Sequence, residues 1–185
     1  NKNFIIGAVA VIAIVIVGGV MALKNKGGNG SDITLPIIQI ATPSAYVLDA
    51  NGARLKELSN GDTLTPPATV QVAEGGSASV NFPDGSIARV QGGTTLTVKS
   101  ATYDKAIGKT NTSIIVSIGR VWSKVIELAT PDSSWEVETV TAGAALRGTA
   151  FDTKVTADAT LFAGAEGAVT VAPVDPNTHN RLETA

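Results

Sequence analysis

The chain has 185 residues, of which 44% are hydrophobic and only 16% charged, and its formal net charge at pH 7 is −2. Because it carries no block of basic residues, we expect no nucleic-acid partner. Since it contains no cysteine, disulfides, zinc–thiolate sites and cysteine nucleophiles are excluded.

An uncharged apolar run from Phe4 to Leu23, flanked by lysines, opens the chain. About twenty such residues, at about 1.5 Å each, cross a hydrocarbon core about 30 Å thick. In lipid every backbone polar group must be bonded internally, which favours a helix. We therefore predict a single hydrophobic helix over residues 1–26. Its cleavage after Ala22 as a signal peptide is a weaker alternative, because the run is long for a signal core.

This predicted helix has two possible roles: a membrane span, or a pilin-like helix that packs against copies of itself in a filament core. Small residues along it would let helices approach closely. An apolar helix followed by a β-rich head resembles bacterial type IV pilins, although the glutamate usual near the start of their helix is absent. The positions expected to face lipid or a neighbouring helix are Phe4, Ile5, Gly7, Ala8, Val11, Ile12, Val15, Ile16 and Gly19.

The Gly- and Asn-rich residues 27–32 predict a flexible linker. The pattern then predicts a β domain over 33–173 and an irregular tail over 174–185. The single histidine, His179, lies in this Pro- and Asn-rich tail, which disfavours a serine–histidine triad.

Short alternating segments rich in Val, Ile and Thr predict the strands of the β domain. They recur every 8–12 residues or so, which favours an all-β antiparallel arrangement. Ala101–Thr112 is interpreted as an exposed loop. The predicted strands are 33–40, 45–49, 69–73, 77–82, 87–90, 95–99, 113–118, 120–128, 134–140, 151–155, 159–163 and 168–172.

Turn signals separate these strands. The strongest is Pro83-Asp84-Gly85-Ser86, between two alternating runs, because Asp-Gly tolerates positive φ and favours a hairpin. A second irregularity lies in Ala144–Val155, where the alternation slips at Thr149–Ala150, directly after Arg147-Gly148.

The order of these motifs resembles the FecR domain family over residues 70–172. The similarity is carried by a strand–DGS–strand hairpin (Ala78–Arg89), RGTAFDTKV (Arg147–Val155) and AEGAVTV (Ala165–Val171). It implies an extracytoplasmic domain of short stacked strands, solenoid-like or a sandwich. It also implies signal relay from an outer-membrane transporter to a cytoplasmic sigma factor. Only Asn1–Asn3 precede the apolar run, so we expect no cytoplasmic part that could hold a sigma factor.

No catalytic residues accompany that resemblance, and we assign a structural role to its motif residues. Gly148 would permit a bulge or the close approach of a strand, and Thr149 would restart the alternation. Arg147 would bond loop carbonyls or a carboxylate such as Asp84 or Glu166; a ligand-binding Arg147 is the minor alternative. The structural motif set is Asp84, Gly85, Arg147, Gly148, Thr149, Phe151, Glu166 and Gly167.

Trp122 and Trp135 are interpreted as core or interface anchors rather than a sugar-stacking platform. Asp49, Asp62, Asp84 and Asp152 lie far apart, mostly in turns, and form no calcium-loop pattern. We expect neither metal nor cofactor and no enzymatic activity.

The sequence therefore favours a non-enzymatic structural protein, a pilus-like surface filament subunit that self-assembles through its apolar helix. The alternative is a single-span, membrane-anchored domain that binds an envelope protein or glycan in envelope signalling.

Overall fold

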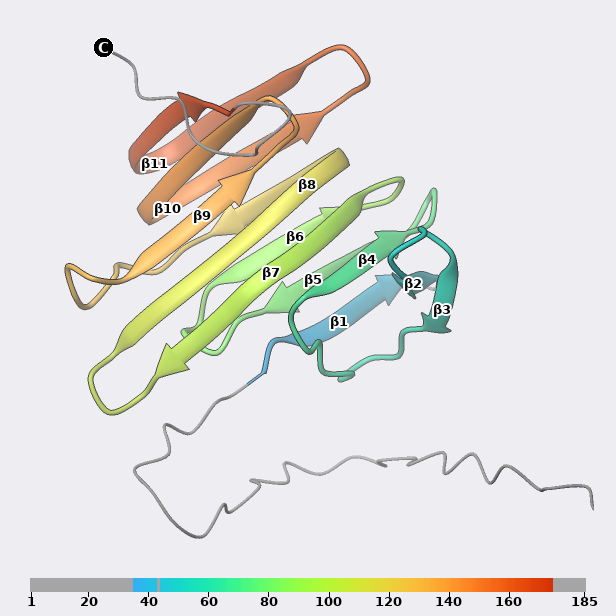
Figure 1. Cartoon of the computed structure of the whole chain (residues 1–185), viewed down its shortest axis with the longest axis horizontal. Helices are drawn as coiled ribbons and strands as arrows, with labels where there is room; N and C mark the ends of the chain where they lie inside the picture. Colours follow the sequence, from blue (N-terminus) through green and yellow to red (C-terminus); the bar gives the residue numbers. More distant parts are fainter. Residues whose placement is uncertain (1–34, 43, 175–185) are drawn as a thin grey trace, which may run out of the picture.

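The computed structural model describes residues 35–42 and 44–174, in which all regular secondary structure is β (Figure 1). The prediction of a mainly β fold is thus confirmed. The predicted helix over 1–26, the linker over 27–32 and residues 175–185 of the predicted tail lie outside the described residues. Inside the described ranges no helix has the length and apolarity that a membrane span requires.

Eleven strands make up the described part. Their bounds are β1 Ile37–Thr42, β2 Ala45–Leu48, β3 Arg54–Glu57, β4 Ala68–Val72, β5 Ser77–Asn81, β6 Ile87–Gln91, β7 Thr95–Asp104, β8 Lys109–Lys124, β9 Ser134–Glu138, β10 Ala142–Val155 and β11 Thr160–Pro173.

The strands form one curled sheet in the order β1-β5-β6-β8-β7-β4-β2-β3, with β9, β10 and β11 joined to it through β8 and β10. In Figure 1, β5 and β6 lie behind β4 and β7. All pairs are antiparallel except β8–β9, which is parallel. An isolated bridge between Ile37 and Thr63 brings the segment before β4 against β1.

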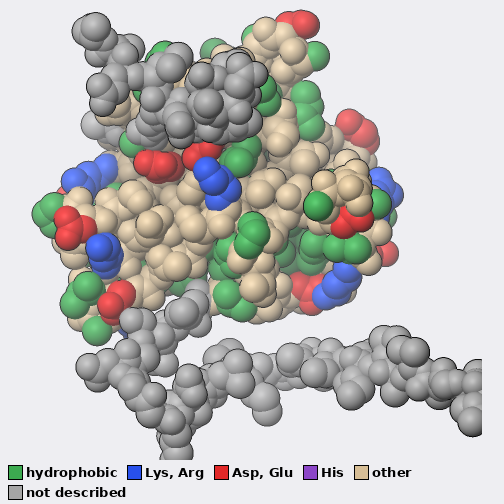
Figure 2. Space-filling view, viewed as in Figure 1, with side chains coloured by type: hydrophobic (Ala, Val, Ile, Leu, Met, Phe, Trp, Pro, Cys, Tyr) green, Lys and Arg blue, Asp and Glu red, His purple; other side chains and the backbone are tan. Residues whose placement is uncertain are grey.

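The core lies inside the curl and follows from the two-residue alternation of the strands. Val70 and Val98 from one side meet Val80 and Val90 from the other in one cluster of buried side chains. The outer surface nearest the viewer in Figure 2 is dominated by neutral polar side chains and backbone. The alternation read from the sequence therefore predicts which side chains face inward.

Strand β8 belongs to both sides of the curl. Its first part pairs with β7 and β9, and its last part pairs with β6 and β10. The change of partner occurs at Gly119, whose φ is +99°. The sequence predicted two strands here, because a glycine interrupts the alternation that the pattern depends on.

The hairpin β10–β11 also bends. Its register shifts on both sides of Ala150, so a bulge lies at the slip predicted at Thr149–Ala150. On one side of the bulge β10 pairs with β9, and on the other side with β8. The bend brings the two ends of the hairpin together, where Thr141 Oγ1 and Thr160 Oγ1 lie 3.0 Å apart.

One local prediction was wrong, and one strand was missed. Ala101–Thr112 is not an open loop, because residues 101–104 and 109–112 extend the β7–β8 hairpin around a tight turn. β3 was not predicted, because all four of its residues are exposed and no buried side chain marks its period.

Asp62 stabilises the segment that meets β1. Its carboxylate accepts hydrogen bonds from Lys56 Nζ (2.7 Å) and from the Ser59 amide (3.0 Å), and these bonds lower the pKa of Asp62. A carboxyl whose folded pKa is depressed adds stability that is present above its unfolded pKa, and this is lost as pH falls through the folded value.

Asp62→Asn is therefore expected to lower the free energy of unfolding at pH 7 by up to about 1 kcal/mol, since Lys56 is largely exposed. The difference from the unsubstituted chain should shrink as pH falls below about 4. Urea unfolding at pH 7 and at a pH below about 4 measures this difference, with Asp158→Asn at an exposed position as the control. An Asp62→Asn effect that is the same at both values would contradict this assignment.

Candidate functional site

The Arg147-Gly148-Thr149 segment forms the corner of β10. Gly148 and Thr149 have no partner in β11, so the bulge leaves them free to bond the chain that follows β8. The Val125 amide donates to the Thr149 carbonyl (2.8 Å), and the Gly148 amide donates to the Ile126 carbonyl (3.3 Å). The corner thus continues the contact between β8 and β10 after β8 ends.

Positive φ is required at this corner on both strands, at Gly148 (+61°) and at Gly167 (+77°). The close approach, however, belongs to Gly167. A Cβ on Gly167 would lie 2.6 Å from the Gly148 carbonyl oxygen, whereas a Cβ on Gly148 would meet no atom closer than 3.6 Å. Gly148 therefore adopts the backbone conformation that the turn requires, and Gly167, which has no Cβ, lets the two strands approach closely.

The DGS hairpin is linked to the same corner. Asp84 is buried, and its carboxylate accepts hydrogen bonds from the Ser86 amide, the Ser86 hydroxyl and Thr110 Oγ1. Ser86 Oγ in turn accepts from the Ile126 amide (3.3 Å), whose carbonyl bonds Gly148. The two motifs, about sixty residues apart in sequence, thus both bond the backbone of one residue, Ile126.

Arg147 is exposed, and its Nη2 donates a 2.7 Å hydrogen bond to the Thr130 carbonyl. That carbonyl belongs to the loop between β8 and β9. Among the predicted carboxylate partners, Asp84 is occupied by Ser86 and Thr110, and the side chain of Glu166 lies outside the described atoms. Arg147 accordingly fixes a loop and leaves the rest of its guanidinium open.

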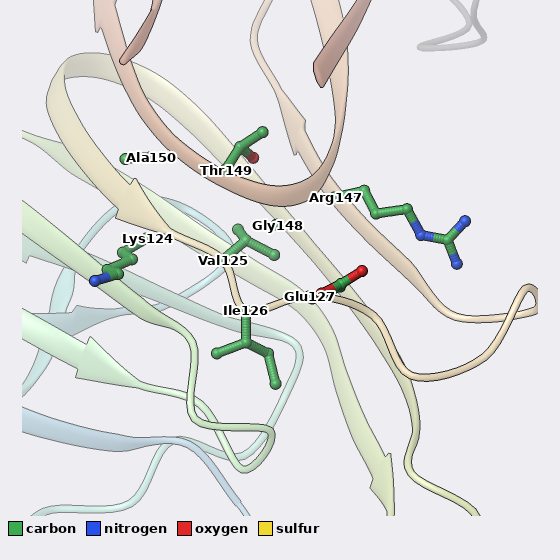
Figure 3. Close-up of a pocket in the computed structure, with 8 residues that line it drawn as sticks. All are labelled: Lys124, Val125, Ile126, Glu127, Arg147, Gly148, Thr149 and Ala150. Carbon is green, nitrogen blue, oxygen red and sulfur yellow. The ribbon is translucent and has the colours of Figure 1, made fainter. Parts of the chain in front are cut away.

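A hollow of about 680 Å³ lies beside this corner. Figure 3 shows Lys124 and Arg147 pointing to opposite sides of it, with Glu127 and Ile126 between them. Lys124, Ile126 and Glu127 are exposed, and the hollow is open to solvent. This arrangement offers charged and apolar contacts to a partner but no nucleophile with an adjacent base.

The remaining predicted residues are dispersed. Phe151 is buried and stacks on Phe162 with ring centroids 5.3 Å apart, and Gly85 turns the hairpin with φ of +93°. Trp135 is buried and Trp122 half-buried on the outer face. Within the described ranges, no three acidic or histidine side chains gather in a way that would hold a metal ion.

Sequence reasoning missed a second hollow, of about 460 Å³, which is lined by Arg89, Arg120, Trp122 and Asp152 among others. Arg120 Nε donates to both carboxylate oxygens of Asp152, at 2.9 and 3.0 Å, and this hydrogen bonding raises the pKa of Arg120. These residues come from three strands that are distant in sequence, and only the register between the strands brings them together. The sequence alone does not reveal that register.

Comparison with known proteins identifies most of this domain. Residues 68–170, more than half of the chain, match the family described as FecR protein. This confirms the resemblance inferred for residues 70–172. Comparison with curated proteins gave no match.

Two crystal structures of a candidate anti-sigma factor from Parabacteroides distasonis ATCC 8503 are also similar, each with a TM-score of 0.39. The sequence identities are 16% and 17%, and the alignments cover 62% and 64% of this chain. The chain spans 57% and 58% of those proteins, so less than two thirds of their length is represented here. A likeness of this size carries no functional argument.

The family match corrects one prediction. The main interpretation, a structural, pilus-like filament subunit, is wrong, because the β domain matches FecR rather than a pilin head. The predicted self-assembly rested on the same interpretation and has no support from the match. The alternative interpretation, a domain for envelope signalling, agrees better with it.

Proposed function

Because this chain belongs to the FecR family, we propose that its β domain is a non-catalytic, extracytoplasmic binding module for envelope signalling. The match over residues 68–170 is the observation that carries the proposal. In this function the domain binds an envelope protein and transmits a signal that depends on whether that protein is bound. The apolar run Phe4–Leu23 serves as the membrane anchor that holds the domain at the envelope.

Binding rather than catalysis is supported by how the motif residues are used. Ser86 and Thr110 both donate hydrogen bonds to Asp84, and Arg147 donates to a loop carbonyl. A catalytic site requires a nucleophile or a proton-transferring group aimed at an open position. The polar groups of these two motifs instead hold the corner of the sheet.

Site-specific photo-cross-linking in the native cell tests this proposal. A photoreactive residue is placed singly at Glu127 in the corner hollow, at Gln91 beside the second hollow, and at Lys105 in the β7–β8 turn. We expect an adduct with a different envelope protein from at least one of the two hollow positions. Lys105 is exposed and lines neither hollow, so it is the matched control.

Adducts formed only between copies of this chain, or none from any position, would overturn the proposed binding function. Equal labelling from Lys105 and both hollow positions would do so too, because it would indicate random collision.

A further inference from the structure

The outer face of strands β6, β8 and β10 gathers positively charged side chains, although the chain as a whole has a net charge of −2. Cross-strand register places Arg89 beside Trp122, and Trp122 beside Asp152, in one row. The neighbouring row places Arg120 beside Lys154. These side chains point outward, because the residues between them, such as Val121 and Thr153, are buried.

This basic face, defined by Arg89, Arg120, Lys124, Lys154, Trp122 and Asp152, carries four cationic side chains and one carboxylate. The whole chain has a net charge of −2, so the positive charge here is local. Asp152 already pairs with Arg120. Among the described residues no salt bridge reaches Arg89, Lys124 or Lys154.

Arg89 is held in place without a carboxylate. Its guanidinium carbon lies 5.0 Å from the centre of the Trp122 ring, a distance typical of a cation–π contact. A stacked guanidinium keeps its edge N–H groups available for a carboxylate, which it can bind through two hydrogen bonds. The 460 Å³ hollow beside it is also lined by residues of β5 and β6, among them Ser79 and Gln91.

We propose that this hollow docks a carboxylate-bearing segment of a partner protein, with an Asp or Glu side chain bound by Arg89. The proposal rests on the function proposed above and names the chemistry of its partner. Charge complementarity favours an acidic occupant. Arginine and tryptophan are also the side chains most often found at the energetic centres of protein interfaces.

Two other kinds of occupant, a glycan and a lipid surface, fit the geometry less well. A sugar ring would need the face of Trp122, over which Arg89 is stacked. A lipid surface favours protruding basic and apolar side chains, whereas Arg89 and Trp122 line a hollow. Protein is thus the occupant that these contacts favour.

Peptide binding to the full chain in detergent tests the proposal. The probe is a fluorescein-labelled peptide of six Glu-Thr repeats, and the comparison peptide has Gln in place of Glu. We expect the Glu peptide to bind more tightly, and Arg89→Gln to weaken its binding about tenfold, the effect of one charge-assisted hydrogen-bonded pair. Fluorescence anisotropy measures both dissociation constants.

Arg54→Gln is the matched control. Arg54 is also an exposed arginine stacked on an aromatic ring, 4.1 Å from the centre of Tyr46, but it lies on β3 outside the basic face. The two substitutions remove the same charge, so non-specific attraction would weaken binding equally in both. Equal effects, or equal binding of the Glu and Gln peptides, would overturn the proposal.

The cross-link at Gln91 gives a second readout. Mass spectrometry of the adduct should identify a partner peptide that contains Asp or Glu. A neutral or basic peptide, or binding of phosphatidylglycerol vesicles or polygalacturonate in preference to the Glu peptide, would overturn this inference. If Glu127 still captured an envelope protein in that case, the proposed binding function would stand without it.

Discussion

Replacing Trp135 by alanine is expected to lower the free energy of unfolding by about 3–5 kcal/mol, the usual cost of removing a large aromatic side chain from a core. Trp135 is 1% exposed and lies edge-on to Phe82, with ring centroids 5.4 Å apart. It joins β9 to the β5–β6 hairpin, and no alanine could fill the space. Guanidinium unfolding of the full chain in detergent, followed by circular dichroism, measures the loss.

Two further variants separate the contribution of buried side-chain area from that of the indole N–H group. Trp122 lies half-buried on the outer face, so Trp122→Ala should cost less than half as much. Trp135→Phe should cost less than Trp135→Ala, because the indole N–H has no hydrogen-bond partner among the described residues. Similar losses in Trp122→Ala and Trp135→Ala would contradict the assignment of Trp135 to the core.

The sequence predicted the parts of this fold that are encoded locally. Alternation in Ala78–Arg89 and the Asp84-Gly85 turn predict the β5–β6 hairpin, which the structure contains. The slip at Thr149–Ala150 predicts a bulge, because a change of phase moves every later side chain to the other face. In both places a few neighbouring residues determine the backbone.

Features that depend on pairing between distant strands could not be read this way. The parallel contact of β8 with β9 joins Asn111–Ile115 to Ser134–Glu138, and no local pattern distinguishes it from an antiparallel one. The basic face likewise exists only because register aligns Arg89, Trp122 and Asp152. The charges were visible in the sequence, but their common surface was not.

The second large effect is expected at Gly119, where β8 changes partner. Gly119→Ala should lower the free energy of unfolding by about 2–6 kcal/mol, the sum of two costs. A φ of +99° is unfavourable for any residue with a Cβ, at about 1–3 kcal/mol. A Cβ there would also overlap the backbone and side chain of Thr94, and such overpacking costs about 1–3 kcal/mol more.

Gly85→Ala isolates the first cost. Its φ of +93° is nearly the same, but its Cβ would meet only Ile126, at 3.9 Å. Thr94 is fixed, since Thr94 Oγ1 accepts from the Arg120 amide (2.9 Å) and donates to the Arg120 carbonyl (3.2 Å), so it cannot move aside. Gly119→Ala should therefore destabilise the domain more than Gly85→Ala by the overpacking cost. Equal losses in urea unfolding would show that Thr94 yields and that the bend at Gly119 depends on backbone conformation alone.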